Sequence, residues 1–200
     1  MESTGKAHAM PAVKKTEPPK KMNFDEFMEW YEHQEGRWEL HDGIPVRRHD
    51  PSKGQAERFR HVRAKSQIFM ALRAAVEKAG LDCEVVADGA TVRIDEQVSY
   101  EPDALIYCGE RVDGNALEAP DPVIIVEVLS PSTAYKDIGD KLEDYFKLPS
   151  LAHYLIIDPK HGRITHHYRE GEQTVQRAVH EKQLELNPPG LVVELTELRS

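Results

Sequence analysis

The chain is poor in cysteine and in long hydrophobic runs. It has two cysteines among 200 residues, Cys83 and Cys108, and its uninterrupted apolar runs are short, such as the four residues from Val123 to Val126. A membrane-spanning helix needs about 20 apolar residues, and the first 21 residues hold no apolar stretch of signal-peptide length. The two cysteines fit no metal-binding spacing and are too few for a disulfide framework. We therefore expect no membrane span, no disulfide framework and a location in the reducing cytoplasm.

Positive charge is also scarce. The chain carries 26 Lys and Arg against 35 Asp and Glu, a net charge of -9. Proteins that bind nucleic acid without specificity neutralise phosphates with Lys and Arg, and the sequence contains neither a zinc finger nor a basic helix with interleaved aromatics. Four arginines could still form a local basic face on one helix: Arg58, Arg60, Arg63 and Arg73.

The organisation predicted from composition is one globular domain with a tail. Residues 1–21 are rich in Lys and Pro, and we interpret them as a flexible extension. The lysines of this extension could contact phosphate. Residues 22–200 form the predicted single domain, since a chain of this length buries about 70% of its unfolded surface.

Local signals predict helices first. Asn23 followed by Glu26 resembles a capping box, which predicts a helix that ends near Gly36. Asp42-Gly43 predicts a tight β-hairpin turn, followed by a loop at 50–55. Apolar residues recur every three or four positions from 57 to 79, which predicts a long helix stopped by Gly80.

Strands dominate the rest of the chain. We expect them at 83–87, 90–94, 103–107, 123–129 and 153–158, with a helix over 134–148 that is capped from the preceding Ser-Pro-Ser-Thr segment. Segments 164–169, 174–179 and 191–195 predict a C-terminal antiparallel β extension. The fold class is therefore α/β (α+β), with a central sheet partly covered by helices.

Glu127 is the most informative residue. It lies in a predicted strand whose other residues are apolar on both faces, a pattern typical of a central strand that is buried on both sides. A buried carboxylate costs several kcal/mol unless it is paired or binds a metal. Either an arginine partner, a place at an open sheet end, or a metal or catalytic role would explain it.

Asp103 and Lys141 are the natural companions of Glu127. Asp103 follows Pro102 at the mouth of a strand, where it is either a turn residue or a second ligand beside Glu127. Two converging carboxylates suit a hard divalent cation such as Mg²⁺. Lys141 lies on the helical stripe that faces the sheet. Measured along the strand direction, its expected offset from Glu127 is about 5 Å, which a lysine side chain can span. Alternatively, Lys141 forms an i,i+4 ion pair with Asp137 on its own helix.

The order of these motifs resembles the Uma-two family of bacterial endonucleases, within the restriction-endonuclease-like PD-(D/E)XK superfamily. The matching segments run from about Asn23 to Leu198: WELHDGIPV, the helix opened by His61, EPDALIY, APDPVIIVEVLSPST, DIGDKLEDYFK and HYLIIDP.

The resemblance implies a restriction-endonuclease-like core, a central mixed sheet flanked by helices, that cleaves phosphodiester bonds with Mg²⁺ or Mn²⁺, with DNA as the expected nucleic acid. It matches Asp103 and Glu127 to the metal-binding acids. The superfamily lysine normally follows two residues after the second acid, where this chain has Leu129, so Lys141 would have to take over.

The resemblance also points to Glu39 and His61. From the residues alone, Glu39 could be a solvated strand residue, and His61 could be a hydrogen-bonded histidine at the edge of the core. His161, His166 and His167 suggest a metal cluster, but neighbours on a strand point to opposite faces, so a surface hairpin is favoured.

Two other functions stay open. Leu129 and the acidic charge are also compatible with a catalytically inactive module that keeps the nuclease fold for binding. The β extension could instead form a homodimer interface, as in an assembly protein.

Overall fold

The computed structural model describes residues 20–48, 58–130 and 135–199. The predicted extension lies outside this part except for its last two residues, and so do the loop at 50–55 and most of the Ser-Pro-Ser-Thr cap. The homodimer and the cytoplasmic location stay predictions. No helix in the described part is long and apolar enough to cross a membrane.

The first helix, α1 (Phe24–Tyr31), begins as predicted. Asn23 Oδ1 accepts a hydrogen bond from Glu26 N at 2.9 Å, and Glu26 Oε2 accepts one from Asn23 N at 3.0 Å, which completes the capping box. The prediction that it reaches Gly36 is wrong, since it ends at Tyr31. The residues after it are polar, so no apolar face holds a further turn against the sheet.

A small antiparallel sheet carries the predicted hairpin. Its strands, in spatial order, are β2 (Ile44–Arg47), β1 (Trp38–His41), β5 (Ser99–Tyr100) and β4 (Val92–Arg93). At the hairpin turn, Asp42 has φ 50° and Gly43 has φ 79°. Asp and Gly tolerate this left-handed backbone, as the dipeptide signal requires.

The central sheet is mixed, as predicted. Its strands, in spatial order, are β10 (Gln173–Val179), β9 (Arg163–Glu170), β8 (His153–Asp158), β7 (Ile124–Val128), β6 (Ala104–Cys108) and β3 (Cys83–Ala87). β7 and β8 are parallel and the other neighbours are antiparallel. Every residue of β7 is buried, so the run around Glu127 is the central strand that its apolar pattern indicates.

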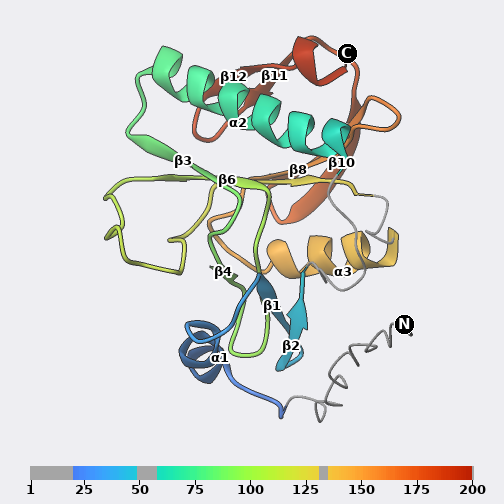
Figure 1. The fold of residues 1–200 in the computed structure, drawn as a ribbon. Helices are drawn as coiled ribbons and strands as arrows, with labels where there is room; N and C mark the ends of the chain where they lie inside the picture. The colour runs from blue at the N-terminus through green and yellow to red at the C-terminus, as the bar shows by residue number, and fades with distance from the viewer. Residues whose placement is uncertain (1–19, 49–57, 131–134, 200) are drawn as a thin grey trace, which may run out of the picture.

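Helices cover both faces of this sheet (Figure 1). On one side lie α2 (Phe59–Ala79) and a C-terminal hairpin of β11 (Gln183–Leu186) and β12 (Leu191–Glu194), followed by a short 3-10 helix, η2 (Thr196–Arg199). On the other side lies α3 (Tyr135–Tyr145). Ile68 of α2 packs in the same cluster as Val126, whereas Tyr145 of α3 packs with Ile125. Alternate residues of β7 therefore enter two cores, which fixes the side toward which each points.

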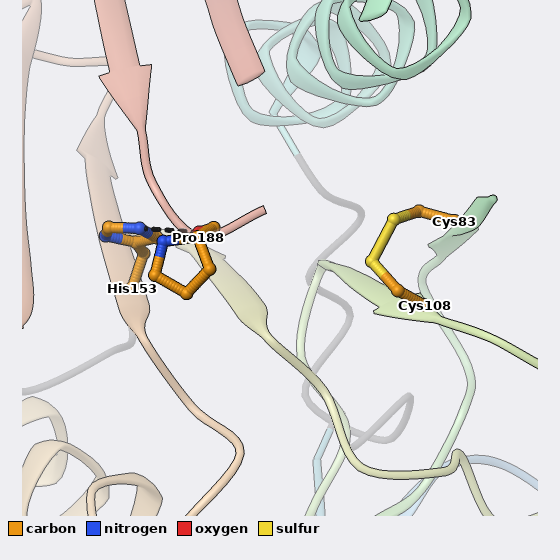
Figure 2. Close-up of a disulfide and its surroundings, with 4 residues drawn as sticks. All are labelled: Cys83, Cys108, His153 and Pro188. Atoms are coloured by element: carbon orange, nitrogen blue, oxygen red, sulfur yellow. Dashed lines mark hydrogen bonds between the residues drawn. A yellow bond between two sulfur atoms is a disulfide. The ribbon is translucent and has the colours of Figure 1, made fainter. Parts of the chain in front are cut away.

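The two cysteines form one disulfide, which the sequence analysis did not predict. β3 pairs with β6 so that Cys83 lies opposite Cys108, with 3.9 Å between the two Cα atoms, and the sulfurs are bonded (Figure 2). The pairing joins segments separated by 25 residues. Register across such a separation is set by tertiary structure, so cysteine spacing alone did not reveal it.

The histidines also differ from the predicted surface hairpin. His161 is exposed, but His166 and His167 are only 2% and 5% exposed, because β9 is an inner strand between β8 and β10. His166 Nε2 lies 3.0 Å from Nδ1 of His153. The other ring nitrogen of His153, Nε2, donates to the Pro188 carbonyl at 2.9 Å, as Figure 2 shows. This chain of hydrogen bonds suits two neutral imidazoles.

Candidate active site

Asp103 and Glu127 face each other across two neighbouring strands. In the antiparallel pair of β6 and β7, Ala104 is opposite Val126, and this register puts Asp103, the residue before β6, opposite Glu127. The backbone N–H of Val128 donates to Asp103 Oδ2 at 2.7 Å and holds the carboxylate there. Residues directly opposite on antiparallel strands share a face. The structure thus brings together the two acids that the sequence analysis pairs.

Lys141 reaches this pair from α3. Its Nζ lies 3.1 Å from Glu127 Oε1 and 2.8 Å from Glu39 Oε1. Leu129, at the position of the superfamily lysine, is half-buried and packs against the apolar cluster beneath α3. The side chain of Asp137, the alternative partner of Lys141, lies outside the described part of the chain. An ammonium group is thus next to Glu127, but it comes from the helix.

Glu39 brings a third carboxylate from the small sheet. Its exposed fraction is 5%, so the interpretation as a solvated strand residue is wrong. Besides the bond from Lys141, it accepts one from the backbone N–H of Glu101 at 3.2 Å, and its Oε2 lies 3.1 Å from His41 Nε2. The pairing of β1 with β5 buries it, because that pairing carries β1 against the strand that leads to Glu101.

His61 adjoins the site through the backbone. It is buried in the first turn of α2, and its Nε2 donates to the carbonyl oxygen of Val128 at 2.8 Å. Val128 therefore donates to Asp103 and accepts from His61. This contact fits the interpretation as a hydrogen-bonded histidine, and it also fixes the strand next to Glu127.

Sequence reasoning missed five charged residues around these acids: Arg37, Arg48, Lys65, Asp88 and Glu101. Arg48 Nη2 lies 2.7 Å from Asp103 Oδ1 and 3.4 Å from Glu127 Oε2. Lys65 Nζ lies 3.4 Å from Asp103 Oδ1 and 2.9 Å from Asp88 Oδ2. Lys65 could have been found, because it lies one helical turn after His61 on the same face. Arg48 follows a hairpin strand and has no pattern that marks it.

Together these side chains form a compact charge network. It contains five carboxylates (Glu39, Asp88, Glu101, Asp103, Glu127) and four cations (Arg37, Arg48, Lys65, Lys141). The network therefore carries one negative charge in excess when all groups are ionised. Tyr145 adds a hydrogen bond from its hydroxyl to Glu127 Oε1 at 3.2 Å.

The network shifts the pKa values of its members in different directions. Burial alone would raise the pKa of Glu39, but Lys141, the hydrogen bond with His41 and Arg48 lower it to about 2. Burial raises the pKa of Glu127, and the Asp103 and Glu39 carboxylates add to that effect against Lys141 and Arg48. Burial disfavours the charged form of Lys141, yet Glu127 and Glu39 raise its pKa above the usual lysine value. Lys141 is therefore a permanent cation at neutral pH.

The donor set suits a small hard cation. Asp103 Oδ1 and Glu127 Oε2 converge on one positively charged atom, Arg48 Nη2. In the described part of the chain, no three His, Cys, Asp or Glu side chains form a ready metal site. Mg²⁺ is commonly held by one or two carboxylates, with water and substrate phosphate completing its shell. These two residues fit that pattern.

A cavity of about 470 Å³ opens beside Asp103, between α2 and the end of β3. Its lining is Val62, Lys65, Ser66, Phe69, Met70, Ala87, Asp88 and Asp103. Ligand sites of this size typically combine apolar walls with a few polar groups. The cavity gives Asp103 an approach from solvent along α2.

Comparisons with known proteins agree with this architecture. Residues 24–198 match the model of the Uma2 family, described as "Putative restriction endonuclease". The chain is 27% identical over 177 residues to the uncharacterized protein slr1290 of Synechocystis sp., an alignment that covers 87% of this chain and 89% of that protein. It is 31% identical over 93 residues to the uncharacterized protein sll1609 of the same organism, covering 45% of this chain and 52% of that one.

A solved structure shares the fold. It is described as a "putative nuclease belonging to DUF820" from Anabaena variabilis, and it superposes with a TM-score of 0.64 at 18% identity. The superposition covers 88% of this chain and 97% of that one. At this identity the likeness establishes the fold.

Proposed function

This chain belongs to the Uma2 restriction endonuclease family, and from that membership we propose that it is a Mg²⁺- or Mn²⁺-dependent endonuclease that hydrolyses phosphodiester bonds of DNA. One observation carries the proposal. Asp103 Oδ1 and Glu127 Oε2 both approach Arg48 Nη2, and the ammonium of Lys141 lies 3.1 Å from the other carboxylate oxygen of Glu127, Oε1.

Asp103 and Glu127 would hold the divalent ion. When bound, such an ion polarises a phosphoryl oxygen and lowers the pKa of an attacking water. Asp103 is oriented for this role by Val128 N–H, and Glu127 by the hydroxyl of Tyr145.

Lys141 would stabilise negative charge that develops on the phosphoryl oxygens. A group that keeps its proton at neutral pH suits electrostatic stabilisation rather than proton abstraction. Glu39 holds the ammonium in place, and a carboxyl group with a pKa of about 2 is a weak base. We therefore assign Glu39 and His61 to positioning, Glu39 through Lys141 and His61 through the Val128 carbonyl.

The cavity along α2 supports a nucleic-acid substrate. Lys65 lines it beside Asp103, and Phe69 supplies an aromatic wall on which a base could stack. The side chains of Arg58, Arg60 and Arg63 are exposed at the start of α2 and could contact phosphates. These arginines supply positive charge at the end of α2 that carries His61, although the chain as a whole is acidic.

Cleavage assays on purified full-length protein test the proposal. Plasmid, single-stranded DNA and RNA are incubated with Mg²⁺, Mn²⁺ or EDTA, using wild type, Asp103→Asn and Glu127→Gln. The control is Asp121→Asn, an exposed aspartate on the connection between β6 and β7. We expect metal-dependent cleavage of DNA that both site variants reduce at least a hundredfold and the control retains. Equal cleavage by all four proteins would refute the assignment.

A second candidate is a binding module that has the fold without catalysis. Leu129 at the position of the superfamily lysine favours it, because Lys141 then serves only to neutralise buried carboxylates. Titration calorimetry separates the two candidates. Absence of Mg²⁺ and Mn²⁺ binding at millimolar concentration, with retained DNA binding, would support the module and exclude the nuclease.

A further inference from the structure

Arg48 occupies the central position of the carboxylate cluster. It follows β2 directly, and its backbone N–H donates to the Arg37 carbonyl at 2.9 Å, which anchors the start of the side chain. The side chain is 18% exposed and extends inward. Its guanidinium contacts Asp103, Glu127, Asp88 and the backbone carbonyl of Glu101.

A divalent ion and this guanidinium compete for the same volume. Arg48 Nη2 is 2.7 Å from Asp103 Oδ1 and 3.4 Å from Glu127 Oε2. Mg²⁺ binds oxygen at about 2.0–2.1 Å, so an ion that bridges these two oxygens on the side that Nη2 occupies would lie within contact distance of Nη2. Two positive charges at such a separation repel strongly in a half-buried site.

The charge balance favours exchange. With Arg48 in place, the five carboxylates of the network exceed its four cations by one. Without Arg48 the excess is two negative charges, which one divalent ion neutralises. An arginine guanidinium keeps its proton in proteins, so Arg48 cannot leave the cluster by becoming neutral. It has to leave by a change of side-chain conformation.

We propose that Arg48 is an internal cation that holds Asp103 and Glu127 together in the metal-free protein and leaves their shared oxygens when the divalent ion binds. The proposal rests on the proposed function insofar as it takes these two acids as the metal ligands. Its consequence is that Arg48 lowers the apparent metal affinity. If the guanidinium fills the position in about nine of ten molecules, its removal tightens binding about tenfold.

Arg37 provides a matched control. It is a second arginine of the same network, where it pairs with Glu101 Oε2 at 2.6 Å and with Asp88. Its described contacts do not include Asp103 or Glu127. Arg37→Gln removes the same charge as Arg48→Gln but leaves the central position filled, so a general loss of positive charge is separated from the removal of a competitor.

The experiment is a calorimetric titration of metal-free, full-length protein with Mn²⁺. We expect Arg48→Gln to bind Mn²⁺ at least tenfold more tightly than wild type, and Arg37→Gln to stay within threefold of wild type. A thermal melt gives a second measure, because the metal-free Arg48→Gln protein should have a lower Tm and a larger Tm increase on adding Mn²⁺. Should this variant not fold without metal, Arg48→Lys, which retains the charge on a shorter side chain, should show a smaller gain in affinity.

The possible failures differ from each other. Equal Mn²⁺ affinity of wild type and Arg48→Gln, with loss of binding in Asp103→Asn, would refute the exchange and leave the metal site of the proposed function intact. Similar gains in Arg48→Gln and Arg37→Gln would also refute it, since charge alone would then explain the effect. No binding by any of these proteins at millimolar Mn²⁺ would overturn the proposed metal site itself.

Discussion

Replacing Lys141 by Met should destabilise the protein by about 3 kcal/mol at pH 7. The ammonium is shared by Glu39 and Glu127, which are 5% and 8% exposed, so its removal leaves two buried carboxylates without their principal cation. Loss of one partner of a buried ion pair costs about 3–5 kcal/mol. The lowered pKa of Glu39 points in the same direction, because Lys141 is the largest of the groups that lower it against the effect of burial.

The pH dependence of this loss has a definite sign. In wild type, the folded-state pKa of Glu39 lies below the unfolded value, so its stabilisation is fully present above pH 4.5 and disappears as the pH falls toward 2. In Lys141→Met, the pKa of the buried carboxyl groups should instead rise. The difference between the two proteins is therefore largest near pH 7 and decreases in acid.

Urea unfolding of wild type and Lys141→Met at pH 7 and pH 4 measures both effects. Lys147→Met is the control, since Lys147 follows the same helix but its side chain is 55% exposed beside Asp144. Exposed pairs of this kind contribute at most about 1 kcal/mol. A loss below 1 kcal/mol for Lys141→Met, or a loss equal at both pH values, would show that Lys141 does not neutralise the buried acids.

Three further predictions concern other parts of the molecule. Burial and the neighbouring His153 lower the pKa of His166 to about 3, so its imidazole is neutral in the folded protein at neutral pH. The unfolded chain takes up a proton below pH 6.5, so the free energy of unfolding should fall by about 1 kcal/mol per pH unit below that value. Denaturant titrations that give a constant free energy of unfolding from pH 7 to 5 would contradict this. Phe69→Ala should weaken binding of a single-stranded DNA oligonucleotide about tenfold in fluorescence anisotropy if bases stack in the cavity, and an unchanged Kd would place the DNA elsewhere. Cys83→Ser should lower the free energy of unfolding by about 3–4 kcal/mol, the value for a closed loop with a separation of 25, whereas an unchanged denaturation midpoint would mean that the bond to Cys108 adds no stability.

The sequence predicted a site residue correctly where its polarity differs from that of its neighbours in the chain. Glu127 stands in an apolar strand, which is enough to predict a buried carboxylate that needs a partner. The stripe on α3 then selects Lys141, because helical periodicity shows that its stem faces the sheet. The hairpin turn at Asp42-Gly43 and the stop at Gly80 are likewise local effects of backbone conformation.

The failures share a different cause. Glu39 is buried because β1 pairs with β5, a strand of two residues too short to show a periodic pattern. Arg48 becomes central because that sheet docks beside Asp103. The bond between Cys83 and Cys108 depends on strand register. In each case the decisive contact joins segments distant in sequence, and no local preference records it.

The course of the chain between the two sheets explains why these contacts meet at one point. β5 ends at Tyr100 in the small sheet and β6 starts at Ala104 in the central sheet, so Glu101 and Asp103 lie on the strand's passage from one to the other. Glu101 donates its backbone N–H to Glu39, and its carbonyl accepts a hydrogen bond from Arg48. The passage therefore fixes the position of the small sheet relative to Asp103.

Lys141 and Arg48, the two cations that bridge the sheets, consequently have different roles. Lys141 of α3 binds Glu39 of the small sheet and Glu127 of the central sheet, whereas Asp103 is held by the backbone N–H of Val128 and by Arg48. This link does not depend on which cation lies between Asp103 and Glu127. If Arg48 exchanges with a divalent ion, Lys141 keeps the two sheets together during the exchange, so the carboxylates can change their cation without the site coming apart.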